Sequence, residues 1–481
     1  MSRYLLEVGV EAIPAGYMPP ALKMLEERAR TGLAELRLAA TGVRTRGTAK
    51  RMVLEIEGLA ECQEDLVREV QGPREDIAFK DGAPTKAAEG FARKNGVEAA
   101  ALEVVETDKG RFVQARVEVK GRPAAEVLPA FLTGLVTDLP WPKTMVWNGT
   151  RFRFPRPVRW VVSLLDDRVL PLAVAGLDAG DRTRGHWLLA PGFHAVGDAS
   201  RLETVLDEKG VILDPEARRE RIAEGLEAEA KRLGGRLVAD DGLLDEVVFL
   251  TEQPTVLSGG FDTRFLDLPR EVTVTAMRSH QRYFAVENEA GELMPHFLVV
   301  CDGRWDDPAQ VVAGNERVLR ARLSDARFYW DVDLAQGLER LADGLQNVVW
   351  LESVGTLFDK ADRVTALVDR LGRSWYAKDW SDRRDHALRA ARLAKADLVS
   401  EMIKDGKEFT GLQGVIGARY AEAQGEPGPV SRALAEQYLP RGASDPLPQS
   451  PEGTVLAMAD RLDTIAGCWA AGFVPSGSQD P

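Results

Sequence analysis

The sequence has little of what metal sites and disulfide scaffolds are built from. Only three cysteines and five histidines occur in 481 residues. Cys62, Cys301 and Cys468 lie far apart, without the close pairing of zinc sites or small disulfide-rich domains. No two histidines have the tight spacing of paired metal ligands. We therefore expect the cysteines to be buried apolar side chains and the chain to hold no metal site.

Long apolar runs are also missing. No run approaches the ~20 apolar residues that a membrane span requires. The N-terminus, MSRYLLEVGVEAIPAGY, lacks the basic head and continuous apolar stretch of a secretory signal. We therefore predict a cytoplasmic chain without a membrane partner.

A surplus of positive charge is missing too. With 62 Lys and Arg against 75 Asp and Glu, the formal net charge is −13, which argues against a generally basic nucleic-acid binder. Any RNA contact must be local, because the field near a surface reflects charges within about a Debye length, ~8–10 Å at physiological salt.

The common motifs of small-molecule enzymes do not occur. The sequence has no Gly-rich loop ending in Gly-Lys-Ser/Thr, no dinucleotide fingerprint, no Gly-x-Ser-x-Gly and no His-Glu-x-x-His. It therefore offers no recognisable catalytic constellation.

Length and hydrophobic pattern predict a multidomain α+β protein, since domains usually hold ~100–200 residues. Residues 1–140 are predicted to form a mixed N-terminal α+β domain, residues 141–332 a β-rich α+β domain, and residues 333–481 an all-helical domain.

Individual elements follow from the same patterns. The first domain opens with a strand at 4–10 and a helix, followed by strands at 50–57 and 111–119 and a helix near 123–138. The second contains a hairpin across 158–175, a helical stretch at 203–233 and strand-like runs, which are TVTAM (273–277), RYFAV (282–286) and HFLVV (296–300). Helical stripes fill the last part, such as Leu388, Ala391, Ala394, Leu398 and Met402, and then Val455, Leu462, Ala466 and Trp469.

The most basic window of this acidic chain is 141–160, WPKTMVWNGTRFRFPRPVRW. It has five aromatic residues, no acidic residue and five basic ones, Lys143, Arg151, Arg153, Arg156 and Arg159. Cations that neutralise phosphates beside rings that stack on bases are what single-stranded RNA recognition requires. The alternative is a β segment with core aromatic residues and a solvated basic face.

A second arginine group lies in 315–330, where Leu319, Leu323, Ala326 and Trp330 make a helical stripe. The flanking cations are Arg317, Arg320, Arg322 and Arg327. They are suited to clamping phosphates. They are equally suited to pairing with Glu316 and Asp325, or to covering an apolar groove.

Two further groups of polar residues each have a structural and a functional interpretation. His280, Gln281 and Arg282 in MRSHQRYF (277–284) either line a pocket or begin a strand with exposed polar residues. In the helical part Asp397, Asp460 and Asp463 point inward, where an unpaired carboxylate is costly. They indicate a relic metal site or buried ion pairs with Arg363, Arg392 or Arg461.

Long ordered strings along the whole chain resemble one family, the β subunit of the bacterial heterotetrameric glycyl-tRNA synthetase. They include LLEVGVEAIPAGY, AFKDGAPTKAAEGFARKNGV, PKTMVWNGTRFRFPRPVRWVVSLL, RTRGHWLLA, MRSHQRYF, GNERVLRARLSDARFYW, VGTLFDKADRV and LAMADRLDTIAG.

The resemblance implies a tRNA-binding, non-catalytic subunit of glycine–tRNA ligase. A separate α subunit is then expected to bind ATP, with Mg, and glycine, and to join this chain and tRNA(Gly) in an α2β2 assembly. No catalytic residue and no bound cofactor are expected here. Contacts with tRNA are expected among the nine cations of the two basic groups.

The helical part resembles the family's HD-type domain, named for a His-Asp metal doublet. The doublet position is Ala396-Asp397 and the closing aspartate is Asp460. Because only His386 lies beyond residue 296, we expect the hydrolase chemistry to be lost. Family members continue past SGSQDP into a portion resembling an anticodon-binding domain, so the resemblance implies a C-terminally truncated chain that lacks it.

Two other functions remain open at this point. One is an HD-type metal-dependent phosphohydrolase with Asp397 and Asp460 as ligands. The other is a stand-alone RNA-binding protein without an α subunit.

Overall fold

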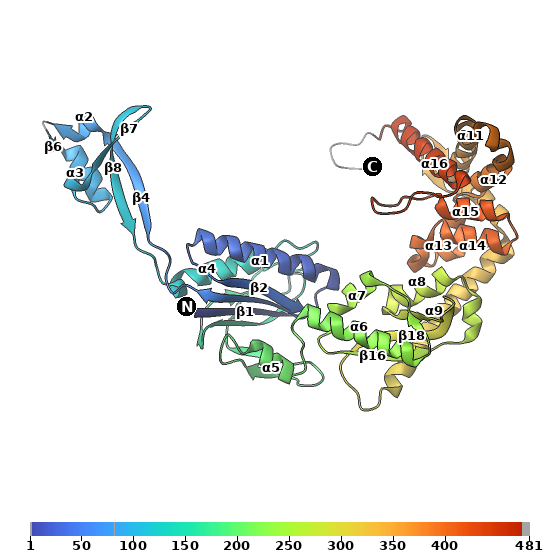
Figure 1. The fold of residues 1–481 in the computed structure, drawn as a ribbon, viewed down its shortest axis with the longest axis horizontal. Coiled ribbons are helices and arrows are strands. Elements are labelled where there is room, and N and C mark those ends of the chain that lie inside the picture. Colours follow the sequence, from blue (N-terminus) through green and yellow to red (C-terminus); the bar gives the residue numbers. More distant parts are fainter. Residues whose placement is uncertain (1, 81, 474–481) are drawn as a thin grey trace. The chain divides into compact units, whose positions relative to one another are not determined.

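The computed structural model describes residues 2–80 and 82–473, which form two compact units (Figure 1). One unit comprises the described residues up to Ala223 together with Leu244–Thr255 and Cys301–Arg304. The other comprises Glu224–Leu243, Val256–Val300 and the described residues from Trp305 onward. The predicted division into three domains stays a prediction.

A five-stranded antiparallel sheet organises the first unit, in the order β10-β9-β1-β3-β2. Its central strand β1 (Ser2–Val10) pairs with β3 (Arg51–Leu59) on one side and β9 (Val158–Leu165) on the other. Every residue from Tyr4 to Val10 is buried, because both faces of the sheet are covered. The strands and first helix predicted here are confirmed.

Helix α1 (Met18–Glu35) packs on β2 (Gly42–Thr48) and β3 and also contacts α4 (Ala124–Thr137). The opposite face carries Leu5, Val53 and Val162, which pack against residues of the 196–213 segment and its helix α5 (Leu202–Glu208). This core lies beside the buried polar residues around Arg51, which are described below.

The predicted hairpin across 158–175 is only partly present. Strand β9 turns back into β10 (Arg168–Val169), where Arg168 pairs with Leu165. The following residues leave this sheet, since β11 (Ala173–Val174) pairs with β12 (Leu177–Asp178).

A small subdomain with its own core lies between β3 and α4 in the sequence (Figure 1). Its sheet has the order β4-β8-β7, formed by β4 (Leu66–Arg74), β8 (Gly110–Val119) and β7 (Glu103–Thr107). Helices α2 (Glu75–Ala78) and α3 (Lys86–Lys94), with the short β5 (Phe79–Lys80) and β6 (Ala83–Pro84) between them, complete it. Ala88 and Ala92 pack against Val113 and Ala115, so a few small side chains supply its core.

The second unit begins with a four-stranded sheet in the order β15-β17-β18-β16. The strands are β15 (Arg236–Leu237), β16 (Pro254–Gly260), β17 (Phe284–Glu287) and β18 (Leu293–Asp302). HFLVV therefore lies in a strand, as predicted, and so does the FAV part of RYFAV, whereas Arg282 and Tyr283 precede the strand. The strand predicted for TVTAM is wrong, because residues 273–277 belong to helix α8 (Arg270–Gln281). Val272, Thr273, Ala276 and Met277 form its buried face at helical spacing.

The helical character predicted for the last part is confirmed. After the long α9 (Ala309–Gln336), the chain is mainly helical, with α10 (Leu338–Gly344), α11 (Leu357–Tyr376), α12 (Trp380–Leu393), α13 (Glu401–Lys404), α14 (Val415–Ala423), α15 (Gly428–Glu436) and α16 (Pro451–Ala470). A short strand pair, β19 (Val349–Leu351) and β20 (Gly355–Thr356), precedes α11. No helix of the described residues is long and apolar enough to cross a membrane.

Both predicted helical stripes need correction. The first is interrupted, since α12 ends at Leu393 and Lys395 adopts a left-handed backbone conformation with φ 69°. On α16 the buried face carries Val455, Ala459 and Asp463, whereas Leu462, Ala466 and Trp469 are exposed. Apolar residues thus occur on both faces of α16, which periodicity alone did not separate.

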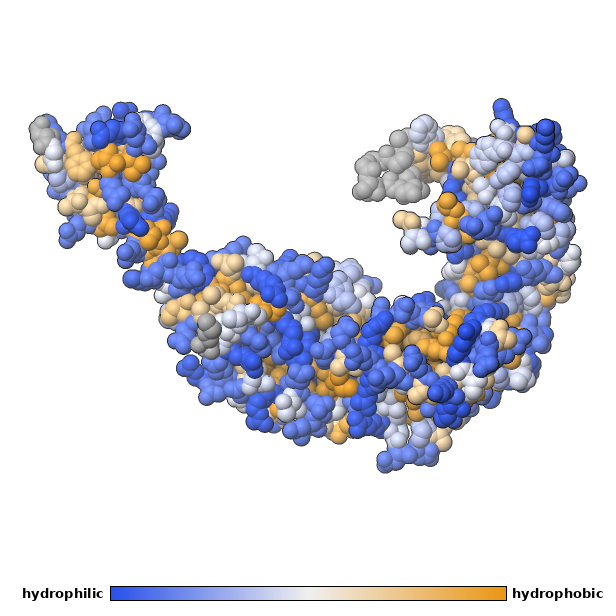
Figure 2. Space-filling model, viewed as in Figure 1, coloured by the Kyte–Doolittle hydropathy of each residue, from blue (hydrophilic) through white to orange (hydrophobic). Residues whose placement is uncertain are grey.

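The prediction of buried cysteines is also wrong, because Cys62 is exposed and the other two are half-buried. The visible surface is mostly hydrophilic, with scattered apolar patches (Figure 2), as is usual for a folded protein.

Candidate nucleic-acid interface

A row of three residues crosses the sheet of the first unit beside a cavity. Arg51 on β3 and Trp160 on β9 both pair with Gly9 on β1, which lies between them. A side chain at Gly9 is impossible without moving the indole, because an added Cβ would lie 1.9 Å from Trp160 Cδ2. The ring therefore lies across the glycine, and the Arg51 guanidinium carbon is 5.4 Å from its centroid.

The Arg51 guanidinium is buried and forms hydrogen bonds through Nε and Nη1. Its Nε lies 2.9 Å from Glu252 Oε1, and its Nη1 lies 2.9 Å from Glu7 Oε1. The same Nη1 donates to the Arg184 carbonyl oxygen at 2.9 Å, and to Thr183 Oγ1. Burial alone would raise the pKa of Glu252, but Arg51 and Lys50 outweigh it and hold that pKa below its ordinary value. Arg51, Glu7 and Glu252 therefore form a buried charged floor beneath a cavity.

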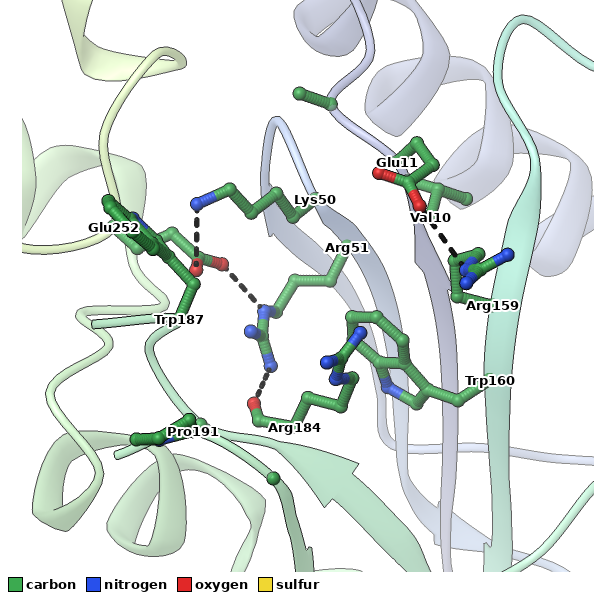
Figure 3. Close-up of a pocket in the computed structure, with 13 residues that line it drawn as sticks. Val10, Glu11, Lys50, Arg51, Arg159, Trp160, Arg184, Trp187, Pro191 and Glu252 are labelled. Atoms are coloured by element: carbon green, nitrogen blue, oxygen red, sulfur yellow. Dashed lines mark hydrogen bonds and ion pairs between the residues drawn. The ribbon is translucent and has the colours of Figure 1, made fainter. Parts of the chain in front are cut away.

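The cavity above this floor has a volume of about 220 Å³. Figure 3 shows the side chains of Lys50, Arg51 and Trp160 around it, with Trp187 and Glu252 on one side and the Arg159–Glu11 pair on the other. We call it the Arg51 cavity. Arg184 on β13 (Arg182–Arg184) also lines it, with its guanidinium carbon 5.8 Å from the Trp160 centroid and 5.4 Å from that of Phe193 on β14 (Phe193–Ala195).

The predicted basic window 141–160 leads into this cavity and is mostly irregular up to β9. All five of its predicted cations, Lys143, Arg151, Arg153, Arg156 and Arg159, are exposed. Among the described residues, only Arg159 of the five pairs with a carboxylate, at 3.2 Å from Glu11 Oε1.

The aromatic residues of this window pack mainly on one another. Ring centroids are 5.0 Å apart for Trp141 and Phe154, 5.6 Å for Phe152 and Phe154, and 5.8 Å for Trp147 and Phe152. The structural interpretation is confirmed in part, because these rings pack together into a small scaffold, but the segment is mostly irregular and Trp141, Trp147 and Phe152 are only half-buried. The cations project outward from it.

The stripe predicted on α9 is confirmed, with Leu319, Leu323, Ala326 and Trp330 buried. Arg317 and Arg320 are exposed, whereas Arg322 and Arg327 are half-buried. Arg327 pairs with Asp331 at 2.9 Å, one turn further along. Glu316 accepts from the backbone N–H of Gly260 at 2.9 Å, so the pairing with Glu316 predicted as an alternative is wrong. Arg317 and Arg320 remain available for a ligand.

The polar residues of MRSHQRYF mark the end of a helix, so the strand start predicted there is wrong. Arg282 caps α8 in the left-handed conformation, with φ 54°. His280 Nε2 lies 3.2 Å from Glu408 Oε1. Tyr283 donates to Asn315 Oδ1 at 2.6 Å and stacks on Phe297 with centroids 4.5 Å apart. These side chains join α8 to its neighbours.

Buried lysines accompany two of the three inward carboxylates of the helical part. Asp460 lies 2.9 Å from Lys395 Nζ and 3.2 Å from Lys360 Nζ, and Asp463 lies 3.1 Å from Lys360 Nζ. Asp463 also pairs with Arg363 at 2.7 Å, as predicted. The predicted pairings of these carboxylates with Arg392 and Arg461 are wrong. Arg392 lies near Glu339 and Arg461 donates to backbone carbonyl oxygens.

The third carboxylate, Asp397, accepts from the backbone N–H groups of Gly414 and Gly417, and its neighbour Ala396 is buried. The cavity between Lys360, Lys395 and Asp460 measures about 10 Å³, which is about the size of one water molecule. Within the described residues no group of three His, Cys, Asp or Glu side chains is placed to hold a metal ion.

The sequence pattern missed the Arg51 cavity. Its residues come from five separate segments, which meet only through the order of the strands. The one local signal was RTRGHW, where two arginines and a tryptophan occur within six residues. Lys360 and Lys395 were missed because lysines in helical sequences are usually solvated.

The fold and these clusters define a mixed α/β protein of two compact units that presents exposed cations around a small aromatic cluster. A family model described as "Glycyl-tRNA synthetase beta subunit" matches residues 4–481. The chain belongs to the glycyl-tRNA synthetase beta subunit family.

The chain is also similar to individual proteins of this family over almost its whole length. The chain is 44% identical to the "Glycine--tRNA ligase beta subunit" of Geobacter sulfurreducens over 100% of its own length and 69% of the relative. The corresponding protein of Moorella thermoacetica gives 44% over 100% and 69%. That of Trichlorobacter lovleyi gives 42% over 99% and 69%.

Proposed function

We propose that this chain is the tRNA-binding, non-catalytic subunit of a glycine–tRNA ligase. In this proposal a separate α subunit binds ATP, with Mg, and glycine and carries out the attachment. This chain holds no cofactor, binds tRNA(Gly) in the cytoplasm and completes an α2β2 assembly. Membership of the family supports the proposal.

The observation that carries the proposal is the exposed cationic window. The whole chain has a formal charge of −13, yet 141–160 contains five cations and no acidic residue. Four of these cations have no carboxylate partner among the described residues. Unpaired cations on a rigid scaffold bind phosphates with little reorganisation, and each such contact releases counterions. Arg317 and Arg320 are the second proposed contact.

We also propose that the helical part retains an HD-type arrangement that has lost its chemistry. The doublet position is Ala396-Asp397 and the closing aspartate is Asp460. The ammonium groups of Lys360 and Lys395 beside Asp460 supply the positive charge that a metal ion would bring.

The test neutralises three cations of the window together, as R151Q/R153Q/R156Q. Binding of fluorescently labelled tRNA(Gly) is measured by anisotropy over a salt series. The log–log salt slope should become shallower by about 2–3, since each lost phosphate contact contributes ~0.7–0.9.

The control is R340Q/R370Q/R432Q, which removes the same charge from exposed arginines of the helical part. It should leave affinity nearly unchanged. Equal losses in both triple variants would show that net charge, and not this window, governs binding.

A further inference from the structure

The Arg51 cavity contains one cation whose charge is not neutralised. Three of its cations have carboxylate partners: Arg51 with Glu7 and Glu252, Lys50 with Asp302 at 3.2 Å, and Arg159 with Glu11. Arg184 has no carboxylate partner among the described residues. Arg184 is therefore the cation lining this cavity that no carboxylate of the described residues neutralises.

The Arg184 side chain is exposed but packs near two aromatic rings. Its backbone carbonyl oxygen accepts from Arg51 Nη1, and its guanidinium lies between the Trp160 and Phe193 rings. Trp160 is in turn held across Gly9, where no other residue leaves room for the ring. A cation fixed in this way loses little conformational entropy when it binds an anion.

Beside this cation the cavity has an unoccupied aromatic surface. Trp187 lines the cavity and is 60% exposed, whereas the Trp160 ring is already covered by two guanidinium groups. An exposed indole next to a cation is suited to stacking a nucleobase whose phosphate reaches the guanidinium.

The volume of the cavity and its position at the end of the basic window limit the kind of ligand that it can bind. At about 220 Å³, the cavity is smaller than the ~300–1,000 Å³ of sites that enclose drug-sized ligands, so it admits one base and no paired duplex. Arg159 lies both on its rim and at the end of the exposed basic window. Its exposed pair with Glu11 is easily exchanged for a phosphate. The basic window thus extends to the rim of the cavity.

We propose that the Arg51 cavity binds one unpaired nucleotide of an RNA strand, with its base stacked on Trp187 and its phosphate on Arg184 and Arg159. This inference rests on the proposed function and names a subsite of it.

The test uses W187A, W187F and R184Q in the full chain, with L188A as the control. Leu188 is the next exposed apolar residue and does not line the cavity. Anisotropy measures the Kd of a labelled single-stranded RNA and of a blunt RNA duplex of equal length. Cytidine and adenosine monophosphates serve as competitors. Circular dichroism melting confirms that each variant is folded.

W187A should weaken single-strand binding about tenfold, because one base stack contributes ~1–3 kcal/mol, a factor of roughly 5 to 150. W187F should retain most of the affinity, R184Q should weaken binding and reduce its salt slope by about 0.7, and L188A and all duplex affinities should stay within about twofold.

Three outcomes would overturn the inference, and they are distinguishable. If W187A and R184Q bind single strands like the unmodified chain while R151Q/R153Q/R156Q does not, the cavity is no nucleotide site and the proposed function still stands. Free monophosphates that bind as tightly as the strand would make it a site for free nucleotides. If the unmodified chain binds neither RNA nor tRNA, the proposed function fails as well.

Discussion

At the scale of single residues, the first unit depends on charged groups that are buried only because each has a partner. Arg51 is the clearest case, since the guanidinium, Glu7 and Glu252 are almost completely buried. Burial of an isolated charge costs several kcal/mol, and removing one partner of such a group leaves that cost uncompensated. The network therefore fixes the geometry of strands β1, β3 and β13 around the Arg51 cavity.

Asp302 makes the stability of the first unit depend on pH. Burial would raise the pKa of Asp302, but His186, Lys50 and the backbone N–H groups of Gln253 and Glu252 together hold it well below the ordinary value of ~3.9. A carboxyl with a lowered pKa in the folded state stabilises the fold at pH above the unfolded pKa. That stability is lost as pH falls toward the folded pKa.

We therefore predict that the unfolding temperature of the first unit falls as pH is lowered from about 5 to 3. D302N should unfold earlier at pH 7 and show a weaker fall, because its amide oxygen still accepts from the Glu252 and Gln253 N–H groups but no longer titrates. Scanning calorimetry across this pH range provides the measurement. D178N, which changes an exposed carboxylate on β12, should match the unmodified chain, and parallel pH profiles for D302N and the unmodified chain would contradict the prediction.

At the scale of elements, α11, α12 and α16 are joined by the two lysines that face Asp460 and Asp463. Lys395 follows the end of α12 in a left-handed conformation. Its ammonium lies 2.9 Å from Asp460 Oδ2 and 3.9 Å from the Tyr438 centroid. Lys360 on α11 lies 4.3 Å from the Trp350 centroid. These contacts replace apolar packing at the centre of the helical part.

K395M should destabilise the helical part markedly, by less than the ~3–5 kcal/mol of a wholly broken buried pair, because Lys360 still faces Asp460. The double variant K395M/D460N should recover much of the loss, since removing both charges together is often nearly neutral. Urea unfolding followed by circular dichroism tests this. K404M, at an exposed lysine of α13, should stay within about 0.5 kcal/mol, and a K395M effect no larger than that would refute the assigned role.

The same elements show how far sequence reasoning reached. Strands β1, β3, β8, β17 and β18 and the helical last part were predicted because their periodicity is clear and local. TVTAM was misassigned because three consecutive β-branched residues resemble a strand, whereas the tertiary structure buries a helical face. In the candidate site, the exposed cations of 141–160 could be predicted from the composition of that window. The convergence of Glu7, Arg51, Arg184 and Glu252 depends on strand order, which no local pattern contains.

At the scale of the whole molecule, an acidic chain presents a local basic surface. The total charge of −13 keeps nonspecific attraction to polyanions low, while exposed cations within about a Debye length, ~8–10 Å, determine the local field. This combination is consistent with the proposed binding of one RNA. The chain spans 69% of the length of the relatives compared, and the cationic window and the Arg51 cavity both lie within it.

The most direct test of the central claim measures two properties of the purified chain, binding of tRNA(Gly) and incorporation of radiolabelled glycine into it with ATP and Mg. The assays use the chain alone, an α subunit alone and the two mixed. We predict that the chain alone binds tRNA(Gly) and incorporates no glycine, and that it raises glycine incorporation when the α subunit is added. Glycine incorporation by the chain alone, or the absence of tRNA binding, would contradict a non-catalytic tRNA-binding subunit.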